Sequence, residues 1–332
     1  MSKVKFGVIS DLHVDLMHDG TERLEAFLED CRREEVDFII QLGDFMHPEI
    51  IPYTDQCKPF VEIGWYSVHV DKARVKELYN GFEKPSYHVI GNHDLNTCTK
   101  EQFLQYFECG EESYYSFDCN GFHFVVLDDN YIKEGDQYLS TSVFGDKGPY
   151  ISGEELAWLE KDLAETKLPA VLFSHQRLSN ECESTILNRE EVRRVIDNAP
   201  AGVVMCINGH EHMDSMYRVG KTWYYNVNSA ASYWLSPDDV LFVCPERYTK
   251  EIDEKFPFIK CTAPYKESIY AIITMDEKGA YIKGKSSEIV GISPLEQGVY
   301  EYPMFKKNVK DVGNEITASI KDRYVAFGQE EQ

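Results

Sequence analysis

Five short segments of this chain carry residues that could bind metal ions, and each segment directly follows an apolar run. The segments are Asp11-Leu12-His13, Gly43-Asp44, Gly91-Asn92-His93-Asp94, His175 and Gly209-His210-Glu211-His212. Carboxylate, imidazole and amide oxygen are donors that suit divalent Mn, Fe or Zn ions. Cysteine is missing from the set, which argues against a structural zinc site held by thiolates. The residue types therefore predict a site for first-row divalent metal ions.

Half of the histidines in the chain belong to these segments. Of ten histidines, five lie just beyond an apolar run. A single histidine in such a place is often only a hydrogen-bonded structural side chain. Five of them, accompanied by Asp and Asn residues, favour one shared functional site.

The apolar runs before the segments are predicted to be buried strands, because they are short and rich in β-branched and aromatic residues. The predicted strands are Val4–Ser10, Val36–Leu42, Ser86–Ile90, Ala170–Ser174 and Val203–Asn208. Between and around them lie helical patterns at Glu22–Glu35, Val68–Phe82, Gly153–Thr166 and Arg189–Asn198. Such alternation predicts an α/β architecture. Open α/β sheets bind ligands at the carboxyl ends of their strands, so we expect the five segments to converge there.

Hairpin signals follow the alternating elements. Asn120-Gly121 separates the apolar runs Tyr114–Cys119 and Phe122–Leu127, and Asn-Gly between such runs is a strong signal for a tight turn. Similar turns are predicted at Gly220-Lys221 and Lys278-Gly279. Parallel strands combined with hairpins predict an α/β (α+β) fold with a pair of mixed sheets and helices outside.

The five segments, in this order, resemble the pattern of the calcineurin-like metallophosphoesterase superfamily. That pattern reads D-x-H, G-D, G-N-H-[DE], H and G-H-x-H, and the match spans Asp11 to His212. The last third of the chain is not covered. The resemblance implies a four-layer αββα sandwich and two divalent metal ions.

The resemblance also implies a role for each matching position. One metal ion would be held by Asp11, His13 and His212, and the second by Asn92, His175 and His210. Asp44 would bridge both ions and, with His93, form the catalytic pair. His93 would lie just outside the ligands, where it could contact the phosphate or protonate the leaving oxygen.

Such a centre is expected to hydrolyse a phosphoester. Two ions can bind a common hydroxide, which attacks phosphorus, and they stabilise charge on the phosphoryl oxygens. We expect a small phosphodiester or nucleotide-type substrate. The alternatives are a phosphomonoesterase and a catalytically silent metal-binding scaffold.

Residues outside the pattern carry weaker signals. The predicted substrate-binding set is Asn92, His93, Arg177 and Tyr233. Arg177 lies two residues after His175 and could reach a phosphate oxygen, although a surface arginine fits equally well. Tyr233 and the adjacent Trp234 could stack on a nucleobase or could pack in the core. Asp128, Asp129 and Asn130 could form outer contacts of the site or a solvated turn.

The charge of the chain limits the size of the substrate. Asp and Glu number 57 and Lys and Arg number 34, so the formal charge is 34 − 57 = −23. Extended nucleic acid requires Lys and Arg to neutralise its phosphates, and the sequence has no dense basic run. We therefore expect a small phosphorylated substrate held mainly by metal ions, and neither an extended nucleic acid nor an Mre11-like nuclease activity.

The same patterns divide the chain and suggest a compartment. Residues 1–289 are predicted to form the metallophosphoesterase domain, with residues 236–266 as a cap or insert. Residues 290–332 would be a C-terminal extension that packs on the domain, and Val309–Arg323 could form a helix. Nine cysteines without a CxxC pair, no signal-peptide pattern and no apolar run of about 18 residues favour the cytoplasm and no membrane partner. The oligomeric state stays open.

Overall fold

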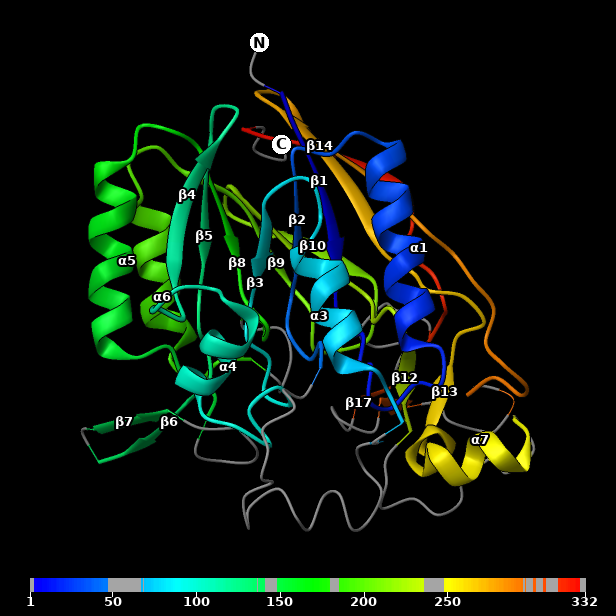
Figure 1. Cartoon of the computed structure of the whole chain (residues 1–332). Helices are drawn as coiled ribbons and strands as arrows, with labels where there is room; N and C mark the ends of the chain where they lie inside the picture. The colour runs from blue at the N-terminus through cyan, green and yellow to red at the C-terminus, as the bar shows by residue number, and fades with distance from the viewer. Residues whose placement is uncertain are drawn as a thin grey trace.

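Two six-stranded mixed sheets lie face to face between two layers of helices in the computed structural model of the chain (Figure 1). The four-layer αββα architecture predicted from the sequence is confirmed. The structure describes residues 3–46, 67, 69–135, 137–140, 148–179, 185–235, 248–294, 296, 301–302, 307–308 and 316–328.

The first sheet has the strand order β18-β15-β14-β1-β2-β3. Its parallel part comprises β1 (Lys3–Ile9), β2 (Phe38–Gln41) and β3 (Ser86–His88). The antiparallel part comprises β14 (Ala271–Asp276), β15 (Gly279–Gly284) and β18 (Arg323–Ala326). The parallel strands all point their carboxyl ends to one edge of the sandwich.

The second sheet has the order β10-β11-β9-β8-β5-β4 and is also mixed. Parallel pairing joins β5 (Phe122–Val126), β8 (Ala170–Phe173), β9 (Val203–Asn208) and β11 (Thr222–Asn226). Antiparallel hairpins add β4 (Tyr115–Cys119) and β10 (Ser215–Val219), as the two turn signals predict.

Three apolar clusters separate the four layers. Side chains such as Phe6, Phe38, Phe124 and Phe173 fill the space between the sheets. A second cluster packs the first sheet against α1 (Gly20–Arg33), α3 (Lys72–Asn80) and α4 (Lys100–Phe107). A third packs the second sheet against α5 (Gly153–Glu165) and α6 (Arg189–Asn198). Because both faces of each sheet are covered, the strand ends are the accessible edge of the sandwich.

Shorter elements lie around that edge. They are the hairpin β6 (Tyr131–Glu134) and β7 (Gln137–Ser140), the hairpin β12 (Ser232–Trp234) and β13 (Thr262–Pro264), α7 (Lys250–Lys255), the 3-10 helix Pro257–Cys261, and the pair β16 (Glu301–Tyr302) and β17 (Lys307–Asn308). The region predicted as a cap, 236–266, is described from residue 248 onward. There, Phe256 and Ile259 pack on Met17 and Ala231.

The C-terminal segment joins the first sheet as a strand. Residues 309–315 of the predicted helix Val309–Arg323 lie outside the described residues, and residues 316–322 are not helical, so that part of the prediction is wrong. Instead β18 pairs with β15, and Ala318, Ile320 and Val325 enter the core between the sheets. Pairing with a strand far away in sequence overrides the local helical pattern.

Among the residues that the structure describes, none of the helices combines the length and apolar composition that crossing a bilayer requires.

Candidate metal centre

The carboxyl ends of five parallel strands bring the predicted site residues together. The residues follow β1, β2, β3, β8 and β9, which belong to both sheets. All five strands point the same way within their sheets, so their ends share one edge of the sandwich. The eight side chains gathered there are Asp11, His13, Asp44, Asn92, His93, His175, His210 and His212.

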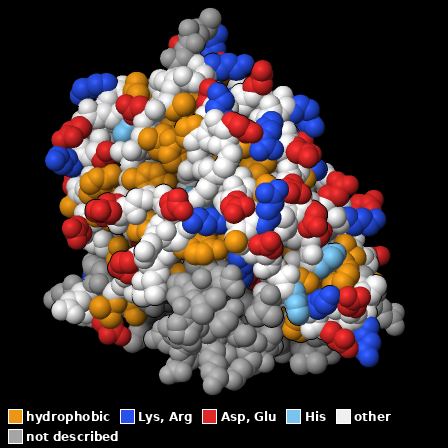
Figure 2. Space-filling model, viewed as in Figure 1, with side chains coloured by type: hydrophobic (Ala, Val, Ile, Leu, Met, Phe, Trp, Pro, Cys, Tyr) orange, Lys and Arg blue, Asp and Glu red, His pale blue; other side chains and the backbone are white. Residues whose placement is uncertain are grey.

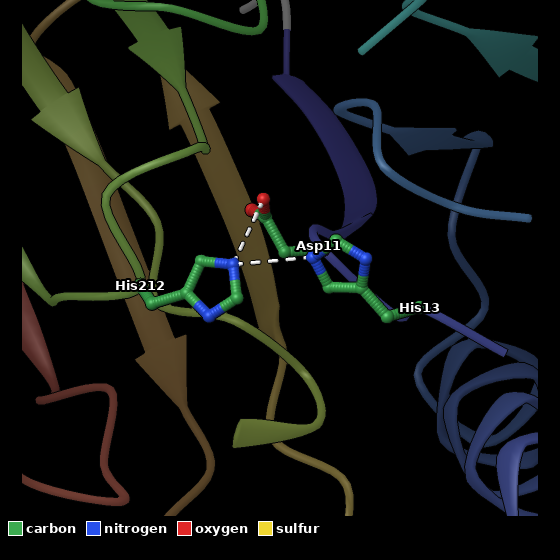
Figure 3. Close-up of side chains that lie close together, drawn as sticks. All are labelled: Asp11, His13 and His212. Carbon is green, nitrogen blue, oxygen red and sulfur yellow. Dashed lines mark hydrogen bonds and ion pairs between the residues drawn. The ribbon is translucent and has the colours of Figure 1, made fainter. Parts of the chain in front are cut away.

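One group consists of Asp11, His13 and His212 (Figure 3). Their potential ligand atoms all lie within 4.8 Å of one another. Nε2 of His212 is 3.3 Å from Nε2 of His13 and 3.3 Å from Oδ1 of Asp11. All three side chains are buried. His13 and His212, 199 positions apart in the sequence, thus present nitrogen atoms to one point beside the carboxylate of Asp11.

A second group consists of Asp44, His175 and His210, with Asn92 beside it. Nε2 of His175 lies 3.3 Å from Oδ2 of Asp44, 3.2 Å from Nδ1 of His210 and 3.0 Å from Oδ1 of Asn92. The amide oxygen of Asn92 therefore faces the same point as the other three side chains.

Asp44 lies between the two groups. Its Oδ2 atom is 3.3 Å from His175 of the second group and 3.8 Å from Nε2 of His13 in the first. The other carboxylate oxygen accepts a hydrogen bond of 2.8 Å from the backbone N–H of His93. This placement is what a carboxylate shared by two neighbouring cations requires.

Backbone carbonyl groups orient two of the imidazole rings. Nδ1 of His175 donates to the carbonyl of Leu42 at 2.8 Å, and Nδ1 of His212 donates to the carbonyl of Ser232 at 2.5 Å. Such outer hydrogen bonds fix the ring orientation and direct Nε2 toward a metal ion. In both residues, Nε2 is the atom that faces the site.

Burial and neighbouring charges set the ionisation of the site. Burial lowers the pKa of His13 and of His210 to about 3, which keeps both imidazoles neutral. Burial opposes ionisation of Asp11, but the neighbouring His212 and His175 outweigh it and lower its pKa to about 2. For His175, the effect of burial is outweighed by Asp44, and its pKa rises to about 10.

The residues fit divalent cations. Oδ1 of Asp11 is buried and has no hydrogen-bond partner. Nε2 of His212 faces that oxygen at 3.3 Å, while Nδ1 donates to the carbonyl of Ser232. A buried carboxylate oxygen without a hydrogen bond is costly unless a cation lies beside it. The donor set of carboxylate, imidazole and amide oxygen suits first-row divalent metals.

The backbone at the site is strained. Five of the site residues have positive φ angles between 44° and 70°, namely Asp11, His13, Asp44, His210 and His212. Residues with a Cβ atom rarely adopt this left-handed region, at a cost of order 1 kcal/mol or more each. The surrounding fold holds these conformations, and each one turns a side chain toward the site.

Two glycines allow the loops to approach one another. Gly43 has a φ of +97°, and a Cβ atom on it would lie 2.5 Å from Nδ1 of His175. A Cβ atom on Gly91 would lie 2.2 Å from the backbone nitrogen and from Oδ1 of Asp44. Gly43 therefore needs both an unusual torsion angle and a close approach, whereas Gly91 needs only the close approach.

Asp94 holds the loop that carries Asp44, a role that the sequence did not reveal. Its carboxylate accepts hydrogen bonds from the backbone N–H groups of Asp44 at 2.9 Å, Gly91 at 2.8 Å, Phe45 at 2.9 Å and Met46 at 3.2 Å. Burial raises the pKa of this carboxyl group, while the donated hydrogen bonds act in the opposite direction. Its place as the last letter of Gly-Asn-His-Asp was the available signal.

His93 lies beside the first group and is half-buried. Its ring centroid is 5.4 Å from that of His13, and its Nδ1 atom is 2.9 Å from Nδ2 of Asn96. This contact with Asn96 holds the ring of His93 beside the first group.

The segment Asp128–Asn130 is buried, so a solvated turn is the wrong interpretation. Oδ2 of Asp129 accepts a hydrogen bond of 2.6 Å from the backbone N–H of Gln176, next to His175. Asp128 pairs with Lys100 at 2.5 Å, and Nδ2 of Asn130 donates to the carbonyl of Ile90. These side chains support the loops behind the site.

Arg177 is buried and forms an ion pair with Glu211, which lies between His210 and His212. Its Nη2 atom also donates to Oγ of Ser215 at 3.1 Å. The guanidinium group thus connects the loop after β8 to the loop after β9. This placement argues against the contact with a phosphate oxygen that the sequence suggested.

Tyr233 and Trp234 point in opposite directions from β12. Tyr233 is 2% exposed and belongs to the core between the sheets. Trp234 is half-buried, and its ring contacts His13, His93 and His212. The substrate contact predicted for Tyr233 is not supported by its buried position, whereas its neighbour lies at the site.

The sequence and the fold both relate this chain to known phosphoesterases. The family described as calcineurin-like phosphoesterase matches residues 4–214. A dimetal phosphatase from Danio rerio is similar in structure, with a TM-score of 0.60 and 15% identity over 87% of this chain and 99% of that one. GAP50, the anchor in the inner membrane complex of Plasmodium, has a TM-score of 0.51 and 12% identity over 88% of this chain and 90% of that one. Comparison with curated proteins finds no match.

The chain therefore belongs to the calcineurin-like phosphoesterase family. It is an enzyme of the metal-dependent phosphoesterase class, as its sequence predicts.

Proposed function

We propose that this enzyme hydrolyses a small phosphodiester or nucleotide-type substrate with the help of two divalent metal ions. The observation that carries the proposal is the position of Asp44. Its Oδ2 atom lies between His13 of one potential ligand group and His175 of the other. Two cation sites that share one carboxylate suit attack on a phosphate group.

The two groups define the proposed ligands. One ion would be bound by Asp11, His13 and His212, the second by Asn92, His175 and His210, and both by Asp44. The donor set fits Mn, Fe or Zn, and it does not select among them. When bound, such ions activate water as a nucleophile near neutral pH and stabilise charge on phosphoryl oxygens.

The protein side chains contribute orientation and a proton. The backbone N–H of His93 fixes Oδ1 of Asp44, so the loops after β2 and β3 are held together. The ring of His93 is anchored by Asn96 through Nδ1. Its Nε2 atom is the group that we assign to hydrogen-bond the phosphate or to protonate the leaving oxygen.

The charge distribution supports a small substrate. The net charge is −23, and on the face shown in Figure 2 the basic side chains lie singly among acidic ones. Long polyanions bind through many Lys and Arg contacts. A small ester can instead be held by the metal ions alone, because their charge outweighs the negative surface locally.

Two other functions are alternatives that the experiment below distinguishes. A phosphomonoesterase would use the same centre on a terminal phosphate. A silent scaffold is the second alternative, because the Plasmodium anchor protein shares the fold. Here, all eight site residues are present and face one another, which favours catalysis.

Metal content followed by rate measurement tests the proposal. Purified protein is stripped with a chelator, reloaded with Mn²⁺, Zn²⁺ or Fe²⁺, and assayed with bis(p-nitrophenyl) phosphate and p-nitrophenyl phosphate. We expect two ions per chain and faster hydrolysis of the diester. Faster hydrolysis of the monoester would show that the enzyme is a phosphomonoesterase. Metal-loaded protein that hydrolyses neither compound would favour the catalytically silent scaffold.

A His93→Ala substitution tests the proposed catalytic histidine. We expect the rate to fall at least a hundredfold, on the order that general acid catalysis provides, while the metal content stays near that of the wild type. Loss of both ions in this variant would show that His93 has a structural role instead.

The cysteines support a reducing compartment. The described cysteines are all free, and Cys31 and Cys206 are buried. Free thiols are typical of the cytoplasm, where disulfides are kept reduced. We therefore propose a cytoplasmic location, and fractionation of tagged protein tests it.

A further inference from the structure

We infer that Trp234 forms a platform on which the enzyme binds a planar aromatic group of its substrate, such as a nucleobase or an aryl group. The inference rests on the proposed function and names a substrate class for the same site. The ring of Trp234 lies 5.6 Å from that of His13, 6.1 Å from that of His93 and 6.2 Å from that of His212. One indole therefore adjoins three histidines of the site at once.

The surroundings of Trp234 differ from those of the other described tryptophans. Trp158 and Trp223 pack against apolar clusters, as structural tryptophans do. Trp234 belongs to none of the four apolar clusters found among the described residues. An indole that contacts polar site residues and keeps part of its surface exposed is available for a ligand.

The fold holds this indole in a fixed place. β12 pairs with β13, where Trp234 lies opposite the buried Thr262. Two residues earlier, the carbonyl of Ser232 accepts the hydrogen bond from His212. The strand that carries Trp234 is thus attached directly to a proposed metal ligand, so the distance between the platform and the metal centre is set by the backbone. A preorganised aromatic surface binds planar groups at low entropic cost.

The position of the platform also fits the expected chemistry. Trp234 adjoins the group with His13 and His212 and lies beside His93, the residue that we assign to the phosphate or the leaving oxygen. A substrate whose phosphate lies on the metal ions would place one of its ester substituents toward this indole. A neutral planar substituent suits an acidic protein, because stacking needs no positive charge, and it tolerates different bases.

A binding experiment tests the inference without turnover. Tryptophan fluorescence of the metal-loaded protein is titrated with AMP and with ribose 5-phosphate, which differ by the nucleobase. We expect AMP to change the fluorescence and to bind at least about tenfold more tightly, the ratio that one stacked base provides. The fluorescence change should persist in Trp158→Phe and Trp223→Phe, whose indoles pack against apolar clusters, and disappear in Trp234→Phe. Equal affinities, or a change that persists in Trp234→Phe, would overturn the inference.

Hydrolysis of three diesters provides the second measurement. A dinucleoside monophosphate, bis(p-nitrophenyl) phosphate and glycerophosphocholine carry a nucleoside, an aryl group and no aromatic group. For each protein, kcat/KM for the better aromatic diester is divided by kcat/KM for glycerophosphocholine. We expect this ratio to fall at least about tenfold in Trp234→Leu. In Trp234→Phe, which keeps an aromatic ring, it should fall less. An unchanged ratio would refute the platform. If the wild type hydrolyses none of the three, the proposed function fails, and the fluorescence titration still decides on the role of Trp234.

Discussion

Buried charge is arranged in two different ways at the strand ends of this enzyme. In the metal centre, Asp11 and Asp44 face imidazole rings, and Oδ1 of Asp11 has no hydrogen-bond partner. Around the centre lie three buried ion pairs in which each acid faces a cation of the chain itself. They are Asp15–Lys72 at 2.7 Å, Asp128–Lys100 at 2.5 Å, and Glu211–Arg177.

The acids that pair with Lys or Arg hold the loops in place, whereas the acids that face imidazole rings are positioned to bind a cation. Asp15 lies two residues after His13, and Glu211 lies between His210 and His212, so both kinds of acid occur on the same segments. The ion pairs give each acid a cation from the chain itself and tie the loops to α3, to α4 and to the loop after β8. The metal centre is complete only with external cations, which is a common property of functional sites and costs stability in their absence.

The largest effect expected from this comparison is the loss of activity in Asp44→Asn. The substitution removes the shared charge and keeps an oxygen that can accept the hydrogen bond from His93. We expect metal binding to be lost and kcat/KM to fall at least about a thousandfold. The midpoint of thermal unfolding in chelator should change little, because Asn keeps the hydrogen bond from His93, and His175 can lose its proton once the charge of Asp44 is gone. A marked drop in that midpoint would mean that Asp44 stabilises the metal-free fold.

Arg177→Met should instead lower the stability of the protein. The substitution leaves Glu211 buried without its cation, and loss of one partner of a buried pair costs about 3–5 kcal/mol. We expect this decrease in the free energy of unfolding, measured with denaturant. The double variant Arg177→Met with Glu211→Leu should recover part of it, because neither charge is then buried alone. A single variant that loses less than about 1 kcal/mol would show that the pair is not needed for stability.

Addition of metal ions should stabilise the folded protein by a smaller amount, and only when the metal centre is intact. A ligand that binds only the folded state at 100 times its Kd stabilises that state by about 2.7 kcal/mol per site. We expect such an increase for wild-type protein and Arg177→Met, and none for Asp44→Asn. Thermal unfolding with and without Mn²⁺ measures it. Stabilisation of Asp44→Asn to the same extent would place the cations elsewhere.

The smallest effect concerns a less buried ion pair, far from the metal centre. His123 contacts Asp162 and Asp118 at 2.7 Å each. The hydrogen bond to Asp162, with help from Asp118, outweighs burial and raises the pKa of His123 above its usual value. A raised pKa adds stability below the pKa of the unfolded state, near 6.5, and this stability is lost as the pH rises through the folded value.

His123→Gln should therefore destabilise the protein more at pH 5.5 than at pH 9, by less than about 1 kcal/mol, as for other exposed or half-exposed pairs. Denaturant unfolding of both proteins at the two pH values measures this difference. A difference that does not depend on pH would mean that the contacts with Asp162 and Asp118 do not favour the charged ring.

Much of the fold could be predicted because local patterns and long-range packing agree. The strand before Asp11 and the turn at Asn120-Gly121 have strong local signals, and the structure has β1, β4 and β5 there. The end of the chain could not be predicted in this way. Residues 316–322 lack helical structure, and their Ala318 and Ile320 side chains pack in the core between the sheets, a contact that no local pattern specifies.

The candidate site, like the fold, could be predicted from the sequence only in part. Its eight residues were found because their types and order are specific. The roles of Asp94 and Glu211 were not predicted, because both resemble ordinary acids in the sequence, and for Asp129 an outer contact was one of two interpretations. Only the folded chain shows which backbone groups and cations they contact.

By itself, the sequence determined which residues end the parallel strands, and therefore which donors meet at one edge of the sandwich. Strand direction and the carboxyl-end rule suffice for that, since they act through the backbone. The tertiary structure alone decided that Asp94 holds the loop with Asp44, that Arg177 pairs with Glu211, and that Trp234 rather than Tyr233 faces the site. These outcomes depend on contacts between distant segments and on which face of a strand is covered, and neither is encoded in the local order of residues.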